Sequence, residues 1–146
     1  MFYRLKIFYT NFASLYFDKE EYDKALEYDL MALKIREEAG DKFSIASSIS
    51  NLANDFAAKG NFSTSREYYE KAISLGREMQ ALEVIKGAYK GMSDNYNELK
   101  DYKSAYEFHK RYSDVKDSLL NEESSNQIAE MQTKYETEKK EQQITL

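Results

Sequence analysis

The sequence of 146 residues contains no cysteine and no proline, and it has only five glycines and one histidine. Without cysteine the chain can form neither disulfides nor thiolate metal sites, and its redox compartment stays undetermined. Without proline, and with so little glycine, long stretches carry no helix breaker. These absences favour a chain built almost entirely of α-helices.

Two further absences concern partners. The formal charge of −5 divides into −2 over residues 1–120 and −3 over residues 121–146, and neither part holds the basic cluster of a phosphate-backbone binder. No apolar run reaches the roughly 18 residues that span a bilayer. Arg4 and Lys6 also interrupt the apolar start, which is therefore unlike a secretory signal. We expect neither nucleic-acid binding nor direct membrane insertion.

Aromatic residues, by contrast, are abundant, and their positions repeat. The chain has 13 tyrosines and 8 phenylalanines, and similar side chains return every 40 residues along the first 120 positions. Two columns hold small residues, a third holds Ala32, Ala72 and the exception Tyr112, and the others hold large apolar ones. The small columns are Ala13, Ala53 and Ser93, and Ala25, Ser65 and Ala105; the large ones include Tyr9, Ile49 and Tyr89; Phe12, Leu52 and Met92; Tyr16, Phe56 and Tyr96; and Tyr22, Phe62 and Tyr102.

Within each block the apolar spacing is helical. Tyr9, Phe12, Ala13 and Tyr16 fall at i, i+3, i+4 and i+7, and a second such stripe begins at Tyr22. Short polar turns separate the stripes, so paired helices must run antiparallel. We predict helices over 3–18, 21–39, 42–59, 63–79, 82–99 and 102–119, in repeats of about 1–40, 41–80 and 81–120, followed by a separate polar helix over 121–146.

The turn sequences also suggest helix caps. Asp18 with Glu21, and Thr64 with Glu67, have the spacing of a capping box. We therefore expect Asp18 and Thr64 to cap the second helices of their pairs.

The columns resemble the tetratricopeptide repeat. The pattern of that family is carried here by Tyr9, Phe12, Ala13, Tyr16, Tyr22, Ala25, Tyr28 and Ala32, and by the residues 40 and 80 positions later. The period of 40 rather than 34, and the missing proline, depart from it. The resemblance implies an all-α, right-handed superhelical solenoid of three antiparallel helix pairs that binds a protein or peptide.

Residues 116–125 and 127–142 are similar to the stretch that follows such repeats in bacterial membrane-bound sensor histidine kinases and related regulators. This second resemblance implies that the chain is the sensory segment of a larger two-component signal-transduction protein, with its repeats on the periplasmic side of the membrane. If the resemblance does not hold, a cytoplasmic location and a structural scaffold or dimerisation role without a ligand remain open.

In a solenoid of this kind the first helices of the pairs line the concave surface. Projecting the inward-facing positions of the family onto the sequence gives a candidate partner-binding groove. The family's clamp for acidic C-terminal tails is matched at only two of five positions, Asn54 and Lys90, so recognition of such a tail is not expected. The alternative is that these positions are simply exposed. They are Thr10, Ser14, Ser50, Asn54, Lys90, Asp94 and Asn97.

The segment after residue 120 has a thin apolar seam at Ile128, Met131 and Tyr135. It covers two turns, fewer than the three or four heptads of a secure coiled coil. Two interpretations stay open: a solvated helix, frayed past about residue 140, or a coupling seam through which two copies form a homodimer.

No motif carries catalytic chemistry. His109 has no partner ligands for zinc, and adjacent glutamates such as Glu37 and Glu38 splay by about 100° on a helix. Gly87 and Gly91 lack phosphate-loop spacing and indicate either close helix packing or a locally weakened helix. The aromatic columns lack the interleaved basic residues of a base-stacking platform. We predict no enzyme, no metal and no cofactor.

Overall fold

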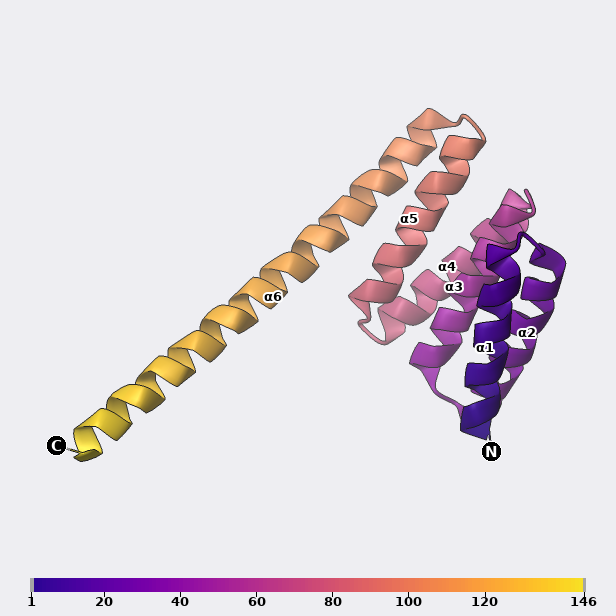
Figure 1. Cartoon of the computed structure of the whole chain (residues 1–146). Helices are drawn as coiled ribbons and strands as arrows, with labels where there is room; N and C mark the ends of the chain where they lie inside the picture. The colour runs from indigo at the N-terminus through magenta and orange to yellow at the C-terminus, as the bar shows by residue number, and fades with distance from the viewer. Residues whose placement is uncertain (1, 146) are drawn as a thin grey trace.

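A computed structural model describes residues 2–145, which form six α-helices and no β-strand. Consecutive helices run antiparallel and stack as three pairs, so that the chain advances along a solenoid (Figure 1). The predicted all-α solenoid is confirmed. The helices are α1 (Phe2–Asp18), α2 (Tyr22–Ala39), α3 (Lys42–Ala58), α4 (Phe62–Glu78), α5 (Leu82–Glu98) and α6 (Tyr102–Thr145).

The first five helices begin and end within one residue of the predicted bounds. The predicted end of the sixth helix near residue 119 is wrong, because α6 runs for 44 residues in all, from Tyr102 to Thr145. No glycine or proline interrupts the sequence between Leu119 and Glu122, so nothing in the chain opposes helix there. The second half of α6 extends beyond α5, away from the other helices (Figure 1).

The turns between helices repeat as faithfully as the core does. A residue with positive φ follows each of the first five helices, at Glu20, Gly60 and Lys100 within pairs and at Gly40 and Gln80 between pairs. The amide that follows such a residue closes the helix; the Asn61 N–H, for example, donates to the Phe56 carbonyl at 2.9 Å. Only two of the five positions hold glycine, the residue that adopts this conformation without strain.

The predicted caps are wrong. Asp18 is the last residue of α1, and Thr64 lies inside α4. The capping side chain of α4 is Asn61, whose Oδ1 accepts from the Thr64 N–H at 3.3 Å, and Asp101 accepts in the same way from the Ser104 N–H at 3.2 Å. The cap position of α2 is therefore Glu21, three residues after the predicted Asp18, and that of α4 is Asn61, three residues before the predicted Thr64.

The two small columns bring the paired helices together. All six of their residues are buried. Where serine replaces alanine, its hydroxyl is satisfied by the opposite helix: Ser65 donates to the Ala53 carbonyl at 2.7 Å, and Ser93 to the Ala105 carbonyl at 2.8 Å. The helices approach closely enough for these short side chains to bridge them, as the small size of the column residues requires.

Beside this contact, two aromatic rings, one from each helix, stack on each other in every pair. Tyr16 stacks on Tyr28 with ring centroids 5.5 Å apart. The rings of Phe56 and Tyr68 lie 5.4 Å apart, and those of Tyr96 and Phe108 lie 5.5 Å apart, in the same parallel geometry. The column of Tyr16, Phe56 and Tyr96 thus points into the fold at all three repeats, as the register predicts.

The two glycines of α5 differ in their surroundings. A Cβ on Gly91 would lie 2.2 Å from Cζ of Tyr69, a buried residue of α4, whereas a Cβ on Gly87 would meet nothing within 4 Å. Of the two interpretations of these glycines, close packing holds at Gly91, where the ring of Tyr69 occupies the space that a side chain would need.

We predict opposite effects of alanine at these two positions. Gly91→Ala forces the Tyr69 ring to move, at a cost of about 1–3 kcal/mol that exceeds the gain of about 1 kcal/mol in helix propensity. Gly87→Ala is the matched control. It has the gain in helix propensity without any clash, and it therefore raises the free energy of unfolding. Urea denaturation of both variants measures the difference. Equal effects would contradict the packing role of Gly91.

Candidate functional site

Two adjoining hollows run along the first helices of the pairs. The first, of about 110 Å³, lies at the junction of repeats one and two. The second, of about 360 Å³, lies at the junction of repeats two and three, and Phe17 and Asn54 line both. Together they form one groove, called here the concave groove, floored mainly by α1, α3 and α5.

Four of the predicted groove residues line these hollows. Ser14 and Asn54 line the first, and Asn54, Lys90 and Asp94 line the second. Lys90 and Asp94 face each other at 3.3 Å on the surface of α5. Because this ion pair is exposed, it contributes little to stability, and either partner can exchange it for a charge on a ligand.

The other three predicted residues lie elsewhere. The Thr10 hydroxyl donates to the Lys6 carbonyl at 2.8 Å and accepts from Nη2 of Arg36 at 3.0 Å, so it is engaged within the fold. Ser50 is half-buried and Asn97 is exposed, and neither lines either hollow. The groove is therefore shorter than the predicted set of residues.

At the base of the first hollow two carboxyl groups are buried together. Asp29 is 4% exposed and Asp55 is 1% exposed. Burial, followed by the charge of Asp29 and the hydrogen bond between the two side chains, raises the pKa of Asp55 to about 8. Burial also raises the pKa of Asp29, against the opposing effects of Asp55, Asn51 and Arg36. Near neutral pH Asp55 is therefore protonated, and its proton lies in the hydrogen bond that it shares with Asp29.

The sequence reasoning missed this pair. Asp29 lies four residues after Ala25, and Asp55 lies three after Leu52, both at helical spacings from core residues. An acidic residue at helical spacing from core residues indicates a buried carboxyl group, and the sequence alone contains this signal. The size of the side chains in the neighbouring columns does not reveal it.

The second hollow has its own buried hydroxyl. Tyr69 donates a hydrogen bond to Oδ1 of Asn54, which holds this predicted groove residue against α4. Burial, and then the charge of Asp94, raises the pKa of Tyr69 to about 12. The tyrosine therefore stays neutral and keeps its proton for this hydrogen bond.

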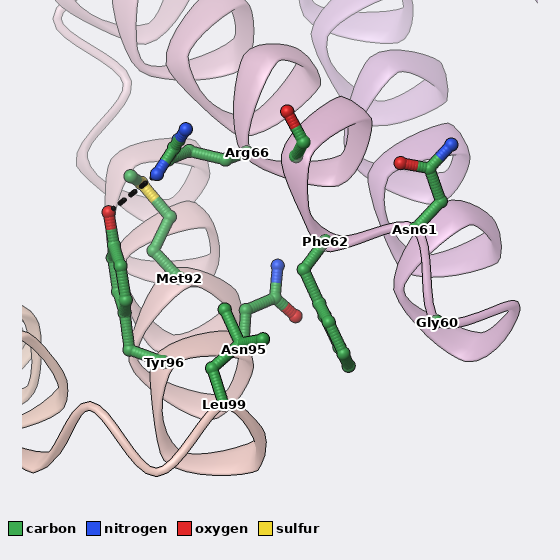
Figure 2. Close-up of a pocket in the computed structure, with 9 residues that line it drawn as sticks. Gly60, Asn61, Phe62, Arg66, Met92, Asn95, Tyr96 and Leu99 are labelled. Atoms are coloured by element: carbon green, nitrogen blue, oxygen red, sulfur yellow. Dashed lines mark hydrogen bonds between the residues drawn. The ribbon is translucent and has the colours of Figure 1, made fainter.

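Another pocket opens away from the groove, beside the turns that join the two helices of repeat two and of repeat three. It has about 390 Å³ and lies between Phe62 at the start of α4 and Leu99 at the end of α5, while Arg66 reaches to the Tyr96 hydroxyl at 3.1 Å (Figure 2). One repeat earlier, the positions of Ser63 and Leu99 are taken by Asp23 and Lys59, whose ion pair of 2.5 Å bridges the equivalent hollow.

The residues of the predicted seam all face solvent. Ile128, Met131 and Tyr135 are each more than 60% exposed, and every residue from 121 to 145 is exposed. His109 is also exposed, and its ring contacts that of Tyr112 at 5.6 Å between centroids. Among residues 2–145, no group of three or more His, Cys, Asp or Glu side chains is placed to hold a metal ion. None of the helices in this range has the length and apolar character to cross a bilayer.

Comparison with known families decides the class. A model described as tetratricopeptide repeat matches residues 4–78, about half of the chain. The chain belongs to the tetratricopeptide repeat family. Members of this family are generally interaction modules without catalytic activity, and the chain is accordingly a protein–protein interaction module of this class.

Solved structures agree on the fold. The tetratricopeptide repeat domain of Arabidopsis FLU aligns with a TM-score of 0.74 at 18% identity, covering 81% of this chain and 99% of that one. BtubC (BKLC) from P. vanneervenii aligns with a TM-score of 0.68 at 25% identity, covering 77% of this chain and 46% of that one. No curated protein matches the sequence.

The buried pair predicts an unusual dependence of stability on pH. An unfolded aspartate loses its proton near pH 4, whereas folded Asp55 keeps its proton to about pH 8. The folded state therefore binds more protons in this range, and the free energy of unfolding falls as pH rises, by up to about 1.4 kcal/mol per pH unit. Below pH 4 both states are protonated and the effect vanishes.

Asp55→Asn should remove this dependence, because the amide imitates the protonated acid. We expect it to raise the free energy of unfolding at pH 8 by about 2 kcal/mol or more and to flatten the profile between pH 5 and pH 8. Asp117→Asn, at an exposed aspartate of α6, is the control. Urea denaturation at several pH values tests this. A flat profile for the unsubstituted chain would exclude the shared proton.

Proposed function

We propose that the chain is the sensory segment of a larger bacterial signal-transduction protein, which binds a protein or peptide in the concave groove. The proposal rests on the groove residues Ser14, Asn54, Lys90 and Asp94, which line two adjoining hollows. These residues supply one hydroxyl, one amide and an exchangeable ion pair. Together they offer donors and acceptors for a peptide backbone and its side chains. The class of the fold supports a protein partner rather than a small substrate.

The observation that carries the signalling part is the continuity of α6. Its first half packs against α5, where Phe108, Tyr112 and Val115 contact the core, and its second half is exposed. At 1.5 Å per residue the 44-residue helix is about 66 Å long. A change in the packing of the third repeat would therefore reorient the exposed half without any hinge between them.

The resemblance of residues 116–142 to the corresponding part of bacterial sensor kinases and regulators supports the same role. In this proposal the repeats form a unit over 1–120, and residues 121–146 form the coupling segment that leads toward an output domain. The repeats would be periplasmic in a membrane-anchored parent of this kind, and cytoplasmic in a soluble one.

Peptide selection tests the groove. We expect peptides selected from a random display library against the full chain to lose about tenfold in affinity on Lys90→Ala or Asp94→Ala, the loss of one charged contact of about 1.4 kcal/mol. Lys71→Ala, on the exposed surface of α4, is the control. Isothermal titration calorimetry gives the affinities. Peptides that bind all three variants equally would place the binding surface elsewhere.

A second candidate function, a dimerising scaffold, is favoured by the exposed seam of Ile128, Met131 and Tyr135. These residues lie on one face of α6 at i, i+3 and i+7. If the seam pairs two copies, serine at all three positions should convert a dimer to a monomer in sedimentation equilibrium. The control places serine at Gln127, Glu130 and Lys134, one position earlier along the same helix. A monomer at all concentrations before substitution would exclude the scaffold.

A further inference from the structure

The first hollow of the concave groove has an acidic base that packing does not explain. Forty residues after Asp29 and Asp55 stand Tyr69 and Asn95, which hold the same places at the next repeat junction. Those two are neutral and fully engaged, Tyr69 with Asn54 and Asn95 with Oγ of Ser65 at 2.8 Å. The fold is thus built with neutral side chains at these positions, and the acids at the first junction impose a burial cost that the architecture does not require.

Besides the hydrogen bonds of Asp29 with Asp55 and Asn51, each carboxyl group keeps one oxygen without a donor. Oδ1 of Asp29 and Oδ2 of Asp55 are buried, and neither receives a hydrogen bond from an N–H or O–H of another residue in the range 2–145. The guanidinium of Arg36, the cation on the same face of α2, donates instead to the hydroxyls of Ser48 and Thr10. Two acceptors at least 96% buried therefore line a hollow that opens to solvent.

The size and lining of the hollow fit a small cationic group. Its volume of about 110 Å³ equals that of three or four water molecules. This accommodates an ammonium group with its last methylenes. The walls are Phe17 and Ala13, which suit an alkyl stem, and the mouth carries the oxygen-bearing side chains of Ser14, Asn51 and Asn54. An ammonium has three donors and no acceptor, and so matches the acceptor oxygens of the two carboxyl groups.

We propose that this hollow is a subsite for one lysine side chain of the bound protein or peptide, whose ammonium group replaces the shared proton between Asp29 and Asp55. The subsite deepens the proposed function, since it lies in the same groove and rests on that groove binding a partner. It specifies the partner's chemistry: a basic residue presented to the first repeat junction. This is the opposite of the acidic tail that the clamp of other family members requires.

Proton release provides a signature of this binding. The charged groups facing the hollow are Asp29 and Asp55, with Arg36 nearby on α2; from α1 the hollow receives Ser14 and Phe17, which do not ionise in this range. Lysine stays charged below pH 10. Binding of one ammonium should therefore release one proton, and the affinity should increase about tenfold per pH unit from pH 6 toward pH 8.

The experiment titrates the isotopically labelled full chain with Nα-acetyl-lysine methylamide and follows amide shifts by NMR. We expect saturable shifts at Ser14, Asn51 and Asn54, using up to about 100 mM probe because a single side chain binds in the millimolar range. The norleucine analogue, which has the stem without the charge, should produce none. Asp55→Asn should abolish the shifts while its spectrum and urea midpoint show that the fold is kept.

Several outcomes would overturn the subsite. These are absent or unsaturable shifts with the lysine probe, equal shifts with the norleucine analogue, retention of binding by Asp55→Asn, or an affinity that does not change with pH. Ca²⁺ or Mg²⁺ shifting the same amides when the lysine probe does not would assign the pair to a metal instead. Selected peptides that weaken on Lys90→Ala but not on Asp55→Asn would leave the groove in place and reject the subsite alone.

Discussion

The fold depends on how closely the two helices of each pair approach. Alanine or serine in both small columns removes the side chains that would hold the helices apart, and the bridges from Ser65 to Ala53 and from Ser93 to Ala105 span the remaining gap. The aromatic stacks then fill the space beside the contact. A larger residue at either column would separate the pair and break the stack at once, because both features occupy the same interface.

The sequence predicted the repeated helices, and it missed the caps and several features that differ between repeats. The 40-residue register placed five helices within one residue, because each bound is fixed by a turn that recurs with the same positive-φ position. The end of α6 has no counterpart in the other repeats, so the register could not supply it. The groove prediction followed family positions. Thr10 lies outside both hollows, where its hydroxyl accepts a hydrogen bond from Arg36, a contact between distant residues that the register does not contain.

The missed residues are informative because they differ between repeats. Asp29 and Asp55 at one junction become Tyr69 and Asn95 at the next, and the ion pair of Asp23 and Lys59 across one hollow is replaced by Ser63 and Leu99 in the next. The same positions of the repeat carry these different side chains. In a solenoid, each junction packs only against its neighbours, so its chemistry can vary without disturbing the others. Positions at which the side chain changes from one repeat to the next therefore mark the parts of the surface that packing leaves unconstrained.

The groove is linked to α6 through α5. A ligand that contacts both hollows touches α1, α3 and α5 together, and α5 is the helix on which α6 packs. A shift of α5 by an amount small enough to keep its own contacts would be carried along α6, because no glycine, proline or change of helix direction interrupts that helix. Displacement at its far end grows with its length, so an uninterrupted helix amplifies a small change at the groove where a flexible linker would absorb it.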